Sequence, residues 1–369
     1  MCRKRLSIES YLVGWICPLE IEQTAAMEML DEEHESLPTS SRDTNVYHLG
    51  SINGHNIVIA GLPQACNTSA ATVITQMRMT FPNLRYGLLV GIGGGVPVRT
   101  DEGPVRLGHV VVSKPTGHHS GAIQYDHGKA LNGRFERTGS LHRPPSVLLG
   151  AAQALAVARL RSDVDPVWQN TRRIAIHRRR LRKFAFPGAA NDHLYRPSYT
   201  HPVGGVSCEV AGCRSDQLIT WDHEEDEEED DPFVIVHRGN IGSGEWVIKD
   251  AMLRDQLARE EGVLCFEQEA AGALNDFPCL VVRGVSDYCD SHKNNIWQGF
   301  AAAAAAAYAR QLFFHMPVEQ ETLSTLALRP NSMSGRQSPF SPGTDDELIE
   351  RKKPNPNLSS MSTSLLTTN

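Results

Sequence analysis

The segment Tyr86-Gly-Leu-Leu-Val-Gly-Ile-Gly-Gly-Gly95 is the best guide to the fold of this chain. Its first half, Tyr86–Val90, is a short apolar run without charge, as expected for a strand that is covered on both faces. The run Gly91-Ile-Gly-Gly-Gly95 then predicts a glycine turn at the strand's carboxyl end, where a ligand can approach the backbone closely. A dinucleotide fingerprint would need glycine in place of Val96, and Pro97 prevents a helix from following. A tight turn without a ligand is equally natural, so the segment alone identifies no function.

The rest of the chain alternates similar apolar runs with helical patterns, which predicts an α/β fold with a largely parallel or mixed sheet. One predicted helix contains seven consecutive alanines, Ala301–Ala307, and small side chains suit a helix that packs close to a sheet. The predicted strands are Tyr11–Cys17, Asn56–Leu62, Tyr86–Ile92, His109–Ser113, Phe233–His237, Val263–Phe266 and Cys279–Gly284. The predicted helices are Glu20–Glu33, Ser69–Thr80, Pro145–Leu160, Glu245–Glu260, Glu267–Asn275 and Trp297–Phe314.

Composition narrows the class of protein. The 369 residues carry 36 Lys and Arg against 43 Asp and Glu, a net charge of −7, and 40% are hydrophobic. With a pI of about 6.1, the chain lacks the basic surface that nucleic-acid or anionic-membrane binding needs. Eight cysteines are too few for a disulfide scaffold, and no apolar stretch is long enough to span a membrane. We therefore expect a cytoplasmic or nuclear globular protein that binds neither nucleic acid nor membrane.

The chain divides into one large domain and less ordered segments. We predict a flexible N-terminus over residues 1–7, an ordered domain over 8–316, and a disordered Ser/Thr/Pro/Asn-rich tail over 317–369. Within the domain, residues 161–231 look poorly structured. They include the basic run Arg172–Lys183 and the acidic run Glu224–Asp231, both of which we interpret as solvated loops.

Polar side chains follow three of the predicted strands. Glu22 comes after the first strand, Glu267 and Glu269 lie where a strand becomes a helix, and the pair Ser286-Asp287 ends another strand. Carboxylates in such places also cap helices, so each position has a purely structural interpretation. Because ligands of open α/β sheets bind beyond the carboxyl ends of strands, we expect these groups and the glycine segment to converge on one crevice.

Cys208 and Cys213, with His193 and His201 nearby, raise the question of zinc. The spacing of the cysteines is at the loose end for a zinc site, and no second pair completes a Cys2His2 pattern. We therefore predict no metal site from the sequence.

Assembled, these residues resemble the purine nucleoside phosphorylase and methylthioadenosine/S-adenosylhomocysteine nucleosidase superfamily, of the PNP/UDP phosphorylase type. The likeness is greatest to its fungal branch, which is found in NACHT-, ankyrin- or TPR-containing receptor-like proteins. The resemblance implies a three-layer α/β/α fold with a mixed central sheet, and usually a homo-oligomer. It runs through residues 11–17, 26–33, 91–97, 106–116, 133–140, 265–272 and 283–299.

The resemblance also implies roles for individual residues. Asp287, next to Ser286, matches the acid that protonates purine N7, and Glu22 matches the glutamate that activates water. Glu269 matches the glutamate that holds the ribose hydroxyls, within the group Glu267-Gln268-Glu269. Further substrate contacts are expected from Val247 and Ile248 at the base and from Gly93 and Gly94 at the sugar.

These roles predict cleavage of the N-glycosidic bond of a purine nucleoside or nucleotide, without a cofactor. Hydrolysis is favoured over phosphorolysis, because phosphate needs Arg and hydroxyl donors that Gly87–Val90 does not offer, and because Glu22 repels an anion. Phosphate stays open as an alternative co-substrate, since the amides of Gly93–Gly95 could cradle it. The alternative to catalysis is a nucleoside-binding sensor or scaffold. That hypothesis rests on Gln268, which replaces an apolar sugar-packing residue, and on a shortened loop at Leu62–Ser69.

Overall fold

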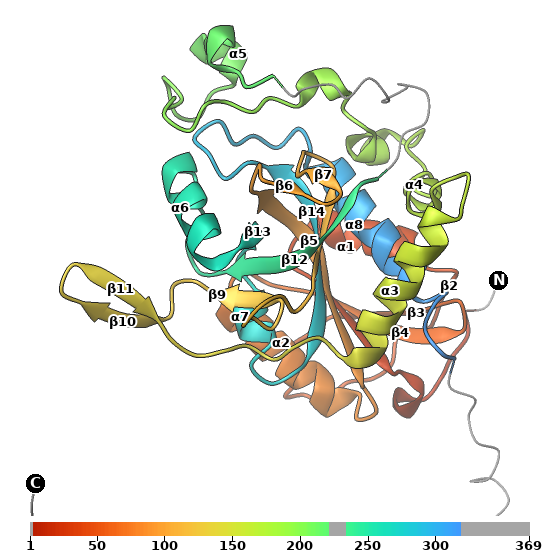
Figure 1. The fold of residues 1–369 in the computed structure, drawn as a ribbon. Helices are drawn as coiled ribbons and strands as arrows, with labels where there is room; N and C mark the ends of the chain where they lie inside the picture. The colour runs from red at the N-terminus through yellow and green to blue at the C-terminus, as the bar shows by residue number, and fades with distance from the viewer. Residues whose placement is uncertain (1–2, 221–233, 319–369) are drawn as a thin grey trace, which may run out of the picture. The chain divides into compact units, whose positions relative to one another are not determined.

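The computed structural model of the chain describes residues 3–220 and 234–318. The acidic run Glu224–Asp231 and almost all of the predicted tail lie outside the described residues. The core is a ten-stranded mixed sheet with the order β13-β12-β8-β14-β5-β1-β4-β3-β2, and β9 pairs with β12 (Figure 1). Its strands are β1 Val13–Cys17, β2 Glu32–Glu33, β3 Tyr47–Ile52, β4 His55–Gly61, β5 Tyr86–Gly95, β8 Val110–Ser113, β9 Ala122–Gln124, β12 Val236–Ser243, β13 Val263–Glu267 and β14 Cys279–Asp287.

Helices cover both faces of this sheet, as the three-layer prediction requires. One hydrophobic cluster joins the sheet to α1, α3, α4 and α8, and a second joins its other face to α2 and α7. The helices are α1 Glu20–Glu28, α2 Asn67–Thr80, α3 Ser146–Leu160, α4 Pro166–Thr171, α5 Cys208–Ala211, α6 Ala251–Glu261, α7 Ala270–Ala273 and α8 Gln298–Leu312. Two small hairpins, β6 Arg99–Thr100 with β7 Gly103–Pro104 and β10 Gly128–Leu131 with β11 Arg134–Arg137, complete the described strands.

The sheet curls so that its two halves meet. β4, β1, β5 and β14 run parallel, whereas β8 pairs antiparallel with β14 and starts a second group of strands, β8, β12 and β13. β13 then pairs antiparallel with the end of β5, through Cys265 opposite Gly95 and Phe266 opposite Gly94. This return brings the carboxyl end of β13 beside the carboxyl ends of β5 and β14, although β13 runs in the opposite direction.

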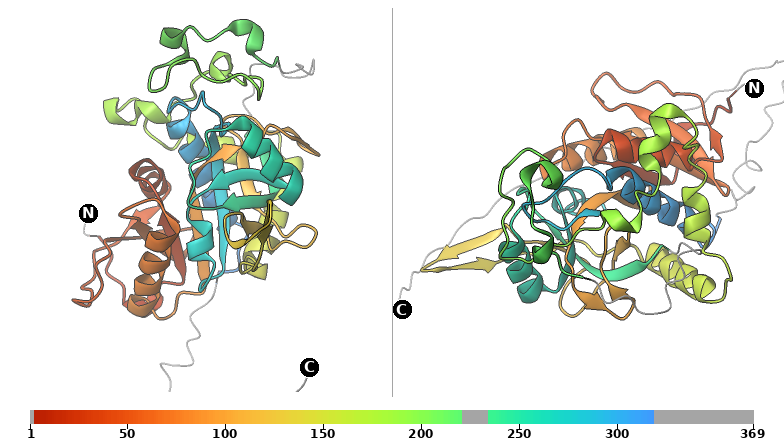
Figure 2. Two further views of the ribbon diagram at one scale, coloured as in Figure 1. Left: turned by 90° about the vertical axis from the view of Figure 1, so that its left-hand side faces the viewer. Right: turned by 90° about the horizontal axis from the view of Figure 1, so that it is seen from above.

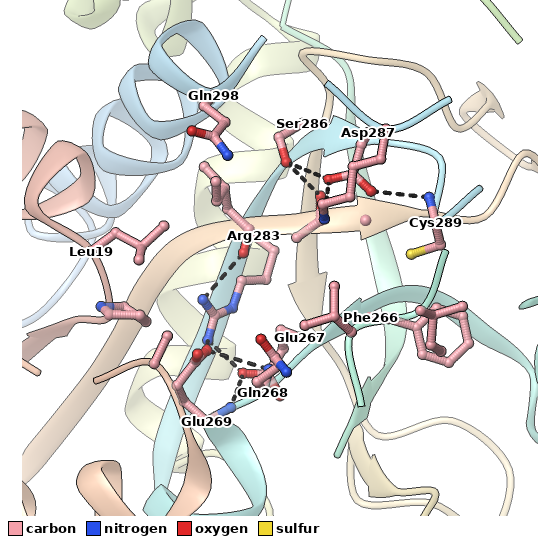
Figure 3. Close-up of a pocket in the computed structure, with 18 of the residues that line it drawn as sticks. Leu19, Phe266, Glu267, Gln268, Glu269, Arg283, Ser286, Asp287, Cys289 and Gln298 are labelled. Atoms are coloured by element: carbon pink, nitrogen blue, oxygen red, sulfur yellow. Dashed lines mark hydrogen bonds and ion pairs between the residues drawn. The ribbon is translucent and has the colours of Figure 1, made fainter. Parts of the chain in front are cut away.

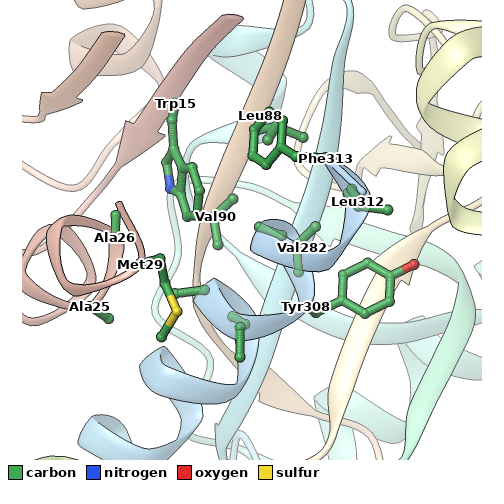
Figure 4. Packing of buried hydrophobic residues seen from close by; sticks show 14 of the residues in the cluster. Trp15, Ala25, Ala26, Met29, Leu88, Val90, Val282, Tyr308, Leu312 and Phe313 are labelled. Carbon is green, nitrogen blue, oxygen red and sulfur yellow. The ribbon is translucent and has the colours of Figure 1, made fainter. Parts of the chain in front are cut away.

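Helix α8 packs against β14 as the alanine run predicts. Ala301–Ala307 are all buried, and a methyl group on Gly284 of β14 would overlap the backbone carbonyl of Ala301. The helix therefore lies closer to the strand than any side chain would allow. Around it, Trp15 stacks on Phe313 and a large apolar core encloses the contact (Figure 4). This packing holds β14, and with it Asp287, in a fixed position.

Five predicted elements have clearly different bounds in the structure. The strand predicted over Phe233–His237 is β12, Val236–Ser243, and the helix predicted over Glu267–Asn275 is only the short α7, Ala270–Ala273. Gly91–Gly95 is not a turn, because β5 continues through it and gains β13 as a second neighbour. The helix predicted over Glu245–Glu260 begins only at Ala251, where the Asp250 side chain caps it by accepting from Met252 and Leu253 N–H groups. The first helix ends at Glu28, and Glu32–Glu33 instead add an edge strand beside β3.

Residues 161–220 form short helical elements joined by loops. Besides α4 and α5, they include the 3-10 turns Arg179–Phe184, Ala189–Asn191 and Ser215–Gln217. These residues gather at one end of the sheet (Figures 1 and 2), and Phe184, Leu194 and Tyr195 are buried there. The arginines of the basic run Arg172–Lys183 are exposed, as predicted for a solvated segment. In the described part of the chain, no helix has the length and apolar character to cross a membrane.

Candidate active site

A cavity of about 250 Å³ opens where β1, β5, β13 and β14 end. The ten residues singled out from the sequence for substrate or catalysis all line it: Glu22, Gly93, Gly94, Val247, Ile248, Glu267, Gln268, Glu269, Ser286 and Asp287. The expected convergence of strand ends is therefore what the structure shows, although the roles of these residues stay predictions. Figure 3 shows Arg283 in the middle of the site, with Glu267 and Glu269 beyond its guanidinium and Asp287 at the other end.

Arg283 organises one side of the cavity. Its side chain lies within β14 and is buried, and Nη2 donates to Glu267 Oε2 at 2.5 Å and to Glu269 Oε2 at 3.0 Å. Nη1 donates to the carbonyl of Ile92 at 3.3 Å. One guanidinium thus faces two carboxyl groups directly, and it also interacts electrostatically with Glu22. Three carboxyl groups thus share one guanidinium in a buried place. Keeping all three carboxyl groups ionised there is costly.

Glu22 is held by two backbone donors. It is the third residue of α1, and Oε2 accepts from the Leu19 N–H at 2.5 Å while Oε1 accepts from the Ile92 N–H at 2.7 Å. The first of these bonds caps helix α1, so Glu22 has a structural role in addition to its place in the cavity. Burial raises the pKa of Glu22 from its ordinary 4.5 to about 7, against the lowering effect of Arg283 and the two backbone donors. A carboxyl group with this pKa exchanges protons readily at neutral pH.

The two glutamates between β13 and α7 have different bonding roles in the structure. Glu267 accepts from the backbone N–H groups of Glu269 and Ala270, at 3.0 Å and 2.9 Å, so it caps the short α7 and anchors Arg283. Glu269 makes fewer bonds, to Arg283 and to the Gln268 N–H at 3.4 Å. Burial raises the pKa of Glu269 to about 8, with Arg283 lowering it and the neighbouring Glu267 raising it. Glu269 is therefore the carboxyl group with free capacity to bind a ligand.

Asp287 is part of a second polar group, at the end of β14. Its Oδ2 accepts from the Ser286 hydroxyl at 2.9 Å and from Lys293 Nζ at 2.7 Å, and its Oδ1 accepts from the Cys289 N–H at 3.0 Å. Burial lowers the pKa of Lys293, but the Asp287 carboxylate raises it by more, so the pKa of the lysine is raised overall. Lys293 is therefore held as a cation beside the Asp287 carboxyl group.

Glycine is required where β5 passes the acids. A Cβ on Gly91 would overlap Glu22 Oε1 and Arg283 Nη1, and one on Gly94 would overlap the Cys289 sulfur. The strand therefore brings its backbone directly against the side chains that line the cavity. This close approach, rather than a turn, explains the run of glycines.

The predicted base-binding segment is a loop between β12 and α6. Ile248 is buried, whereas Val247 and the neighbouring Trp246 expose more than half of their surface at the mouth of the cavity. The Gln268 amide donates to the carbonyl of Glu245 at 3.0 Å and so ties this loop to the β13–α7 junction. Gln268 thus has a structural bond of its own at the place where the family pattern has an apolar residue.

Two charged residues of the site were not predicted from the sequence. Arg283 could have been predicted, because a charged residue inside the otherwise apolar run of β14 needs a buried partner. Lys293 follows Asp287 by six residues in a loop, and no periodic pattern marks it. Trp246, Phe266, Cys289 and Gln298 also line the cavity without having been predicted.

Solved structures of low sequence identity share this architecture. Futalosine hydrolase of Helicobacter pylori is 14% identical, with a TM-score of 0.51 over 83% of this chain and 99% of that chain. The methylthioadenosine/S-adenosylhomocysteine nucleosidase of the same organism is also 14% identical, with a TM-score of 0.51 over 86% and 100%. The corresponding nucleosidase of Streptococcus pneumoniae is 13% identical, with a TM-score of 0.51 over 83% and 100%. This chain has the nucleosidase fold.

Two longer proteins are similar to this chain in sequence. A nucleotide-binding leucine-rich repeat (NLR)-like protein of Hyaloscypha variabilis is 39% identical over 353 residues, which are 95% of this chain and 33% of that protein. The ATP nucleosidase Cap17 of Escherichia coli strain KTE188 is 33% identical over 88 residues, 22% of this chain and 17% of that protein. The chain thus spans a third or less of these relatives. No protein-family model matches it.

Proposed function

We propose that this chain hydrolyses the N-glycosidic bond of a purine nucleoside or nucleotide. The observation that carries the proposal is that one cavity holds Glu22 and Glu269 on one side and Asp287 on the other. This is the set of acids that the resemblance to the nucleosidase superfamily implies. The similarity to an ATP nucleosidase and the shared fold with other nucleosidases support the same reaction class.

Asp287 serves the departing base. In N-glycosidic cleavage, positive charge grows on the ribose while the bonding electrons pass to the base, so a proton at N7 of a purine stabilises the leaving group. Lys293 Nζ lies 2.7 Å from Asp287 Oδ2. We assign Asp287 as the group that delivers a proton to N7, and Lys293 as the cation that stabilises the Asp287 carboxylate left behind. A group of this kind contributes about 10²–10⁴-fold to the rate.

Glu22 and Glu269 serve the sugar. A carboxyl group such as Glu269 can accept hydrogen bonds from two neighbouring ribose hydroxyls, and negative charge near the ring stabilises the oxocarbenium-like state. Glu22 then takes a proton from water as the water oxygen bonds to C1′. The bond between C1′ and the base nitrogen breaks, its electron pair leaves with the base, and the products are the free base and the free ribosyl moiety.

The charges of the cavity favour water over phosphate as the second substrate. Among the residues that line it, Arg283 and Lys293 are the basic ones, and both are bound to carboxylates. A phosphate dianion beside Glu22 would meet a carboxylate in place of a free cation, which is unfavourable in a buried site. Phosphorolysis would require one of these ion pairs to break.

Release of free base tests the proposal. The full chain is incubated with adenosine, inosine, methylthioadenosine or ATP, each with and without inorganic phosphate, and the products are separated by chromatography. Base release without phosphate is the expected result, with losses of about 10²–10⁴-fold in Glu22→Gln and in Asp287→Asn. Exposed Glu20 in the same helix turn offers the matched control, Glu20→Gln, which keeps activity.

Other outcomes would lead to different conclusions. Release that depends on phosphate would mean phosphorolysis and a different role for Glu22. No release from any substrate, together with measurable nucleoside binding, would favour the nucleoside-binding sensor, an idea that the NLR-like relative makes reasonable.

A further inference from the structure

A cluster of metal-ligating side chains lies outside the cavity, in residues 161–220. His201, Cys208 and Cys213 each offer one ligand atom, and these atoms all lie within 4.8 Å of one another. Both cysteines are free thiols, and the three side chains are half-buried. His193, the other histidine near them in the sequence, is not part of the cluster. Of the two histidines and two cysteines considered in the sequence, the structure brings His201 and both cysteines together.

Local structure explains why the loose spacing of the cysteines brings their sulfurs together. Ser207 caps α5 by accepting from the Val210 N–H, so Cys208 begins a single helical turn. Gly212 ends that turn in the left-handed conformation, with φ of 68°, and the Cys213 N–H donates to the Cys208 carbonyl at 2.9 Å. Chain reversal over one turn thus places residues 208 and 213 side by side, a geometry that the number of intervening residues does not reveal.

A second observation at this place is His292. His292 is only 6% exposed, and neither ring nitrogen has a hydrogen-bond partner among the residues that the structure describes. The ring lies 5.2 Å from the ring of His201, between centroids, and stacks on Tyr195 at 3.9 Å. A buried imidazole without partners is costly, and binding to a metal removes that cost.

We propose that His201, Cys208 and Cys213 bind one zinc ion, with His292 as the candidate for the fourth ligand. Two thiolates and imidazole nitrogen suit zinc, whereas magnesium and calcium require oxygen ligands. Tetrahedral zinc has ligand atoms roughly 3–4 Å apart. Small movements of the His201, Cys208 and Cys213 side chains, whose ligand atoms lie within 4.8 Å of one another, bring these three into that range. The inference concerns a structural metal and does not rest on the proposed hydrolysis.

The site would connect residues 161–220 to the loop that follows Asp287. The His201 N–H donates to Ser291 Oγ at 2.9 Å, and His292 precedes Lys293, the partner of Asp287. Zinc at this place would therefore fix the loop that positions Lys293. His201, Cys208 and Cys213 are far from Asp287 and Lys293 in the sequence, and the fold brings them to the same loop.

Metal content of the full chain tests the proposal. The protein is prepared without a polyhistidine tag and with reductant, and bound zinc is measured by plasma mass spectrometry; we expect about one zinc per chain. Cobalt substitution should give the visible bands of tetrahedral Co²⁺ together with thiolate charge-transfer absorption. Cys208→Ser and Cys213→Ser should lose both signals. The controls Cys66→Ser and His193→Asn should keep them, since neither residue belongs to the cluster.

If the serine variants fail to fold, the wild-type protein provides the measurement. Removing zinc with a chelator should lower Tm, and zinc but not magnesium should restore it. The proposal is overturned if reduced, metal-free protein takes up neither zinc nor cobalt at micromolar concentration. It is also overturned if Cys208 and Cys213 form a disulfide in protein handled with reductant, or if Cys66→Ser abolishes metal binding equally.

Discussion

Replacement of Glu22 by glutamine should separate catalysis from stability. In the structure the carboxyl group is 3% exposed, and burial raises its pKa from 4.5 to about 7. A group whose pKa is higher in the folded state stabilises the fold fully below pH 4.5 and loses this contribution as pH rises through 7. Keeping Glu22 ionised at pH 8 therefore costs about 3 kcal/mol of folding free energy, and at pH 5 less than about 1 kcal/mol.

Glutamine removes this cost but loses one hydrogen bond. The Leu19 and Ile92 N–H groups each donate to a different oxygen of Glu22, and glutamine has only one carbonyl oxygen to offer. A lost hydrogen bond of this kind costs about 1 kcal/mol. The expected balance is a gain of about 2 kcal/mol for Glu22→Gln at pH 8 and no gain at pH 5. Activity should fall by about 10²–10⁴-fold in the same variant.

Urea denaturation of wild type, Glu22→Gln and Glu20→Gln between pH 5 and pH 8 measures the effect. The reasoning predicts a stability difference that grows with pH for Glu22→Gln and stays constant for Glu20→Gln, since Glu20 is exposed. A difference of the same size at every pH would refute the argument, because then Glu22 does not change its protonation between these conditions.

Four further outcomes can be checked by kinetics and by urea denaturation. Base release should rise with pH through about 7, as Glu22 loses its proton, and a flat profile would contradict its role as base. Lys293→Met should lower the rate constant by about 10²-fold or more while leaving nucleoside binding within a few-fold, measured by steady-state kinetics and calorimetry. Gly91→Ala should cost about 1–3 kcal/mol in urea denaturation, because its methyl would overlap Glu22 and Arg283. Gly150→Ala, where a methyl meets no atom of the described residues within 4 Å, should instead gain about 0.5–1 kcal/mol.

Much of the fold follows from local patterns. The apolar runs locate six strands close to their observed positions, because uncharged stretches of this length are stable only when covered on both faces. The alanine run likewise predicts a helix packed tightly on the sheet, and Gly284 shows how close that contact is. The edge strand β2, its neighbour β3 and the hairpin β10–β11 were not predicted. Half-exposed strands of this kind have weak apolar patterns.

The candidate site was predictable where a side chain must follow a strand end. Glu22, Glu269 and Asp287 meet this condition, and all three line one cavity. Lys293 could not be predicted, because a lysine in a loop has the same local pattern whether it faces solvent or a buried carboxylate. The cytoplasmic or nuclear location and the homo-oligomer stay predictions from composition and from the superfamily resemblance.

By itself, then, the sequence determined six strands of the sheet, most of the longer helices and which acids end the strands, since these depend on neighbours a few residues apart. Only the tertiary structure decided that β13 turns back against β5, which places Glu267 and Glu269 around Arg283. It also decided that His201 meets Cys208 and Cys213 beside His292. Both arrangements join residues distant in sequence, and their free energy comes from pairing and burial that no local pattern records.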